Sequence, residues 1–167
     1  MGLRAVILAS PETMSDLAWA AEQRYQDGIT LLGAGRHAGA VYVFGLASEM
    51  WLKLASGKLL GHGPAAAVAG LLGPVRTWMH LNGSTVLPES YHSLRFWAEH
   101  LVLRRTSMGL PLAGRLAGEL RHHVSHRLFE DWKIELRYRQ VALAPPDALR
   151  VYHDATWVRQ TWGQLWR

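Results

Sequence analysis

Apolar residues fill nearly every position of a helical pattern between about residues 36 and 56, and no charged side chain occurs from Ala38 to Ala47. The one ionic pair of this segment is Glu49 and Lys53, which have i,i+4 spacing with the acid first, the favourable order on a helix. A helix without a polar face must be covered on most sides. We therefore expect residues 36–56 to form the central helix of a bundle, with Glu49 and Lys53 as a structural ion pair on it.

Four further segments place apolar residues at spacings of three and four, which is the pattern of amphipathic helices. They cover residues 15–32, 91–108, 112–129 and 145 onward. Thr13 and Asp16 suit a capping box ahead of the first segment. Ser90 suits a cap for the second segment, and Asp147, which follows two prolines, suits a cap for the last.

Residues 58–90 are interrupted by glycines and prolines and show no sustained period. They predict two short helical pieces, over residues 64–72 and 74–81, and then a loop. This segment is either a packed connector or a loop that covers a site or binds a partner. The whole pattern predicts an all-α protein, a single domain over residues 1–167 with about five main helices and short extra helices between the second and the third.

The composition narrows the class of protein. The chain of 167 residues has no charge-rich or low-complexity linker, and it is long enough to bury a sizeable core. It contains no cysteine, which excludes disulfides and thiolate metal sites. Its central apolar run is shorter than the roughly 20 residues that a membrane-spanning helix needs. We expect a soluble, cytoplasmic protein that does not associate with a membrane.

The charge balance is strongly basic, with a net charge of +5 and a sequence pI of about 10.0. Arginine supplies nearly all of the basic residues, since only Lys53, Lys58 and Lys133 are lysines. Guanidinium groups bind phosphate or carboxylate in a planar, bidentate fashion. This balance suits a nucleic acid or an acidic protein partner. The arginine content is equally compatible with the codon usage of a GC-rich genome.

Several short motifs follow one another in an informative order. They are R-Y-x-D-G at residues 24–28, G-R-x-A-G-A-V-Y at 35–42, A-S-E-M-W-L-K-L at 47–54 and H-S-L at 92–94. The last and most specific is an aromatic residue, Trp132, followed after four residues by Arg137 and Tyr138. This order resembles the HEPN family, in which the H-S-L segment usually reads H-D-L. The resemblance implies a small all-helical bundle that is often a homodimer.

HEPN ribonucleases carry an arginine and a histidine separated by four to six residues on a late helix. Arg121 and His126 match this spacing. The resemblance implies that His126 acts as general base or acid on a ribose 2′-hydroxyl or on the leaving oxygen, and that Arg121 stabilises the charge of the phosphorane. Five residues of an α-helix correspond to about 140° of rotation, so one helix does not aim both side chains at one phosphate. A homodimer with this helix at its interface would relieve the mismatch.

Other polar residues are candidates for substrate or nucleotide contacts. Arg137 can bind a phosphate while Tyr138 stacks on a base, and His122 neighbours the Arg121 motif. The alternative for Arg137 and Tyr138 is structural, with the arginine paired to Glu49 or Glu135 and the tyrosine packed under the last helix. No metal site is expected.

Two functions follow from these observations. The first is a HEPN protein that acts on RNA, a metal-independent endoribonuclease of the toxin or defence type that needs no cofactor. The second is a non-catalytic HEPN module that binds a nucleotide or a partner, such as a small nucleotidyltransferase or an antitoxin. Whether the protein is an enzyme depends on the role of Arg121 and His126.

Overall fold

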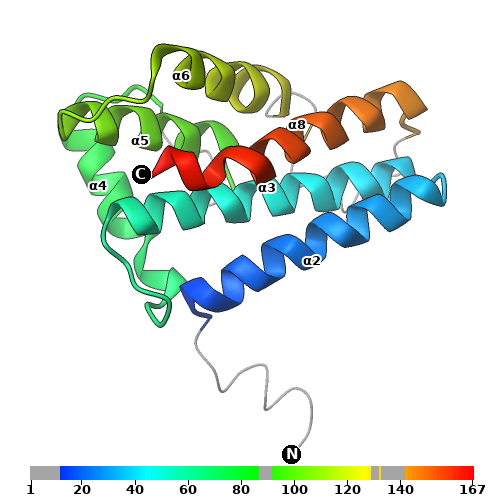
Figure 1. Ribbon diagram of the computed structural model, residues 1–167, viewed down its shortest axis with the longest axis horizontal. Helices are drawn as coiled ribbons and strands as arrows, with labels where there is room; N and C mark the ends of the chain where they lie inside the picture. Colours follow the sequence, from blue (N-terminus) through cyan, green and yellow to red (C-terminus); the bar gives the residue numbers. More distant parts are fainter. Residues whose placement is uncertain (1–11, 87–91, 129–131, 133–141) are drawn as a thin grey trace, which may run out of the picture.

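Helix α3 (His37–Leu59) runs through the middle of the bundle, and it packs against α2 (Met14–Gly33), α5 (Leu94–Ser107) and α8 (Pro145–Leu165) (Figure 1). The described residues also form four shorter elements: the 3₁₀ turn η1 (Val68–Gly70), α4 (Leu72–Leu81), α6 (Gly114–Leu120) and the π-helix η2 (Arg121–Leu128). The computed structural model describes residues 12–86, 92–128, 132 and 142–167, and every regular element in these ranges is helical. The prediction of an all-α bundle is confirmed.

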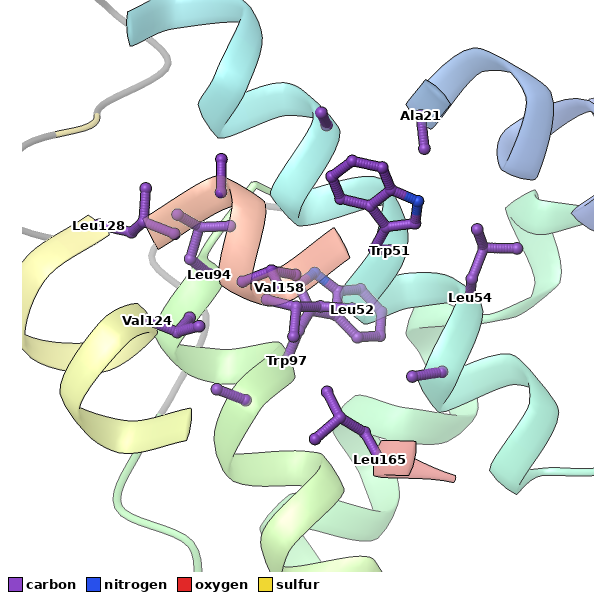
Figure 2. Packing of buried hydrophobic residues seen from close by; sticks show 14 of the residues in the cluster. Ala21, Trp51, Leu52, Leu54, Leu94, Trp97, Val124, Leu128, Val158 and Leu165 are labelled. Carbon is purple, nitrogen blue, oxygen red and sulfur yellow. The ribbon is translucent and has the colours of Figure 1, made fainter. Parts of the chain in front are cut away.

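The apolar pattern of α3 explains its central place. From Ala47 to Gly57 every residue of α3 except Met50 is buried. Figure 2 shows side chains of this stretch within one core together with residues from α2, α5, η2 and α8; the labelled members are Ala21, Trp51, Leu52, Leu54, Leu94, Trp97, Val124, Leu128, Val158 and Leu165. A helix that is apolar all round can lie only where other helices cover it.

The start of α2 shows the predicted capping box. The hydroxyl of Thr13 accepts the backbone N–H of Asp16 at 3.2 Å, and the carboxylate of Asp16 accepts the N–H of Thr13 at 3.0 Å. These two bonds satisfy two of the donors that the first turn of a helix leaves without an intrahelical partner.

The next two backbone donors of α2 explain why residues 64–67 are not helical. The N–H groups of Met14 and Ser15 donate to the carbonyls of Ala66 and Pro64, each at 2.9 Å. The alanine-rich segment therefore runs beside the start of α2. Of the helix predicted over residues 64–72, the structure has the single turn η1 and Leu72, which is the first residue of α4. The second predicted piece, residues 74–81, corresponds to α4.

Two helix starts differ from the predicted ones. Ser93, not Ser90, caps α5, since its hydroxyl accepts the N–H of Phe96 at 3.3 Å. Ala144, which offers no side-chain acceptor, occupies the cap position of α8, and the carboxylate of Asp147 accepts a bond from Arg150 at 3.0 Å. Ser90 lies outside the described residues.

The helix predicted over residues 112–129 is divided into α6 and the π-helix η2. Its buried side chains, Leu120, Val124 and Leu128, recur every four residues. Four residues of an α-helix exceed one turn by about 40°, so this row would drift away from its neighbours. The wider turn of a π-helix reduces the drift. It keeps the row in the core while η2 contacts both α5 and α8.

Helix α8 is held to α2 by polar contacts as well as by the core. Arg159 donates two bonds to the carboxylate of Glu22, both at 2.9 Å, and its guanidinium lies 5.0 Å from the ring centre of Tyr25. The hydroxyl of Tyr25 lies 2.7 Å from that of Thr156. None of the described helices is both long and apolar enough to cross a membrane.

A close approach between α2 and α3 gives a first prediction. A Cβ atom on Gly28 would lie 2.5 Å from Cε1 of Phe44, which is fully buried, whereas one on Gly39 would lie 3.4 Å from the flexible end of Leu31. Gly28→Ala should therefore lower the free energy of unfolding by about 1–3 kcal/mol, the usual cost of overpacking. Gly39→Ala is the matched control and should leave stability unchanged or slightly raised in urea unfolding. Equal stabilities for the two variants would contradict the close approach.

Candidate functional site

The site is built on η2, whose side chains fall into rows that repeat every four residues. The row of Val124 and Leu128 is buried, and the row of His122 and His126 is exposed. Arg121 lies between these two rows on the side of the helix that faces α5. His123 and Arg127 lie between the rows on the side that faces α8. Five of the eight residues of η2 are thus arginines or histidines, and all five are at least partly exposed.

The residues predicted to be catalytic lie on neighbouring faces of this helix. Arg121 is 43% exposed, and its Nε atom lies 3.6 Å from Oε2 of Glu99 on α5. His126 is exposed to solvent. Hydrogen bonds of a π-helix join residues five apart, so the residue five positions on lies in the next turn rather than about 140° away. The π-helix therefore reduces the angular separation that a regular α-helix would impose on this pair.

The most strongly constrained group of the site is one that the sequence did not predict. Asp154 of α8 is fully buried, and its carboxylate binds two residues of η2. Nδ1 of His123 lies 2.7 Å from Oδ1, and Nε of Arg127 lies 3.2 Å from Oδ2. A buried carboxylate is costly unless it is paired and hydrogen-bonded. The two basic side chains therefore account for the burial of Asp154.

The tautomer of His123 follows from this contact. An ionised carboxylate only accepts hydrogen bonds, so Nδ1 of His123 carries the hydrogen and donates it to Asp154. In the neutral imidazole the lone pair then lies on Nε2. The ring also stacks on Trp157, with centroids 4.7 Å apart and planes inclined by 21°, and it meets the edge of His122 at 5.2 Å. Asp154 and Trp157 together fix the orientation of the imidazole.

One sequence signal could have revealed Asp154. It stands on the inward face of α8, next to Ala155 and between the buried Val151 and Val158. An acidic residue on such a face needs a basic partner from another element. Its partner could not be identified, because a period of 3.6 residues does not describe η2 and so misplaces His123.

Glu49 and Lys53 form a buried ion pair on α3. The second oxygen of Glu49 lies 2.9 Å from Nδ1 of His92, a side chain that is 38% exposed, and the ammonium of Lys53 lies 5.6 Å from the ring centre of Trp97. Burial lowers the pKa of Lys53, and the Glu49 carboxylate opposes that shift. This pair lies in the core of the bundle. Arg137, Tyr138 and Glu135 lie outside the described residues.

Two hollows lie at the start of α3. They have volumes of about 290 and 200 Å³ and share Leu143; the first is lined by residues 35–39 and Ala142, and the second by Val41, Asp147, Arg150 and Val151. The guanidinium of Arg150 already binds Asp147. None of the described residues that line them is a buried polar side chain. Nor do any three histidine, aspartate or glutamate side chains of the described ranges converge on a metal site.

Comparison of the chain with protein-family models, with curated proteins and with solved structures gives no match. The motifs of the sequence and the geometry of η2 are therefore the features that bear on function.

Proposed function

We propose that this protein acts on RNA as a metal-independent endoribonuclease, with η2 facing the substrate. The observation that supports the proposal is the π-helix itself, because it brings Arg121 and His126 onto neighbouring faces of one helix. The flanking His122 and a net charge of +5 favour a polyanionic substrate.

The reaction needs only acid–base chemistry and charge stabilisation. A histidine takes the proton of a ribose 2′-hydroxyl, whose oxygen attacks the adjacent phosphorus. The guanidinium of Arg121 stabilises the negative charge that develops on the phosphorane. The bond from phosphorus to the 5′-oxygen then breaks, and this oxygen receives a proton from an imidazolium. The products are a 2′,3′-cyclic phosphate and a 5′-hydroxyl.

A homodimer is part of this proposal. With η2 near a twofold axis, each exposed His126 would lie beside Arg121 of the other copy. The toxin or defence role implied by the HEPN resemblance fits an enzyme that cleaves cellular RNA.

A second candidate is the non-catalytic module that binds a nucleotide or a partner protein. The ion pair between Arg121 and Glu99 favours it, because this arginine already has a carboxylate partner within the same chain. The hollows beside α3 offer a place for a small molecule.

Cleavage of a fluorescent single-stranded RNA in the presence of EDTA separates the two candidates. His126→Ala should lower the cleavage rate by about 10²–10⁴-fold, the usual contribution of acid–base catalysis, while RNA binding persists. His80→Ala, which removes an exposed histidine from α4, is the matched control and should cleave as the parent does.

Binding should weaken steeply between low and moderate salt, because arginine–phosphate contacts would release counterions. A parent protein that binds RNA without cleaving it would favour the non-catalytic module. A parent that neither binds nor cleaves RNA would overturn the proposal.

A further inference from the structure

The buried carboxylate of Asp154 binds His123, which lies between Arg121 and His126, the two residues of the predicted motif. Asp154 is fully buried on the apolar face of α8, and its oxygens face His123 and Arg127 of η2. Substituting such buried ionic groups by well-packed apolar residues of similar volume often causes no loss in the free energy of unfolding. Packing alone therefore gives little reason for an aspartate at this position.

We propose that His123 is a second proton-transfer residue of this site and that Asp154 is its positioning residue. The proposal rests on the proposed function, and it assigns the two proton transfers of the cleavage reaction to two different histidines. Nε2 of His123 takes the proton of the 2′-hydroxyl, and the imidazolium of His126 gives a proton to the leaving 5′-oxygen. Exchange of protons with water then restores both rings.

The contacts of the two histidines differ in the way these roles require. The ring of His123 is bound by Asp154 at 2.7 Å and stacked on Trp157, so its tautomer and orientation are fixed before substrate binds. Its side chain is 21% exposed, which leaves part of the ring accessible. His126 is exposed three positions further along η2. A base gains from a fixed geometry, because proton transfer needs hydrogen-bond distance to one particular hydroxyl.

The charges around His123 also suit a proton acceptor. Asp154 faces the ring from α8, and Glu119 of α6 interacts electrostatically with His123 from the preceding turn. Arg127 of η2 is the neighbouring cation, and it is bound to the same carboxylate of Asp154. The two carboxylates stabilise the imidazolium that forms when His123 accepts the proton, as a carboxylate does for the histidine of a hydrolase triad.

Three variants test the assignment with the full-length protein and the same RNA. His123→Ala should lower kcat by about 10²–10⁴-fold with KM nearly unchanged. Asp154→Asn should also lower kcat and alter the pH–rate profile, because an amide can donate to Nδ1 and so allow the wrong tautomer. His80→Ala should again retain the activity of the parent.

The tautomer can be measured without any cleavage. Nitrogen-15 NMR of the parent should show the hydrogen of neutral His123 on Nδ1, and Asp154→Asn should shift this balance toward Nε2. If Asp154→Asn does not fold, the parent spectrum and the partly exposed His123→Ala still decide the matter. A parent that cleaves RNA together with an equally active His123→Ala would overturn the role of His123 alone. A parent that does not cleave RNA would overturn this role together with the proposed function.

Discussion

Replacing Glu49 by glutamine is expected to lower the free energy of unfolding by about 3–5 kcal/mol, the range for breaking a buried ion pair. The carboxylate of Glu49 accepts bonds from Lys53 and from His92, and the side chains of both Glu49 and Lys53 are almost fully buried. In the variant, Lys53 stays in the core next to an amide that carries no charge. The cost of removing its ammonium from water is then no longer offset by Glu49. Urea unfolding at neutral pH measures the loss.

A second i,i+4 ion pair supplies the matched control for this experiment. Nε of Arg115 lies 2.8 Å from Oε1 of Glu119 on one helix, but the arginine is largely exposed. Glu119→Gln should leave stability unchanged, because an exposed pair gains little in water. The double variant Glu49→Gln with Lys53→Met should cost less than the sum of its two single variants, since it removes both charges together. A Glu49→Gln variant as stable as the parent would show that the pair contributes nothing.

The stability of the protein should fall by on the order of 3 kcal/mol as the pH drops from about 6.5 to about 4, because of His100 alone. His100 is fully buried on α5; burial, and secondarily the nearby Arg104, lower its pKa to about 4. Between these pH values the unfolded chain binds a proton at this histidine and the folded chain does not. Protonation therefore favours the unfolded state, and the stability present above pH 6.5 is lost as the pH falls.

Comparison of variants isolates this contribution from the carboxylates that also titrate in acid. His100→Gln removes the titrating group while it keeps a polar partner for Ser56, whose hydroxyl lies 3.1 Å from Nδ1 of His100. Its stability should depend less steeply on pH than that of the parent. His122→Gln, at an exposed histidine, should keep the slope of the parent. Parallel curves for His100→Gln and the parent between pH 6.5 and 4 would contradict the assignment.

Local sequence signals were sufficient to predict much of the fold. The central position of α3 follows from an apolar pattern on every face, and the start of α2 follows from Thr13 and Asp16, which lie three residues apart. The cap of α5 shows the limit of such signals. Ser90 and Ser93 both have the right chemistry, and only the structure shows that Ser93 is bound to the N–H of Phe96.

The features that sequence analysis did not predict depend on contacts between elements that are far apart in the sequence. The π-helix arises where one row of side chains must stay against α5 and α8 together, a condition that no local propensity encodes. Likewise, His123 and Asp154 are 31 residues apart, and their pairing becomes visible only when η2 and α8 are placed side by side. Sequence analysis predicted site residues on this helix, namely Arg121, His122 and His126, but it did not predict the contact between His123 and Asp154.

The docking of α8 has a consequence for the order in which the chain folds during its synthesis. Its contacts with α2 join residues as far apart as Glu22 and Arg159, which are separated by 137 positions, so they close a long loop of chain. A nascent chain that has been synthesised only through η2 lacks Asp154 and therefore lacks the bond that orients His123. During translation the helices α2 to η2 can assemble before the orientation of His123 is fixed. The orientation of His123 is thus set only after α8 has been synthesised and has docked on η2.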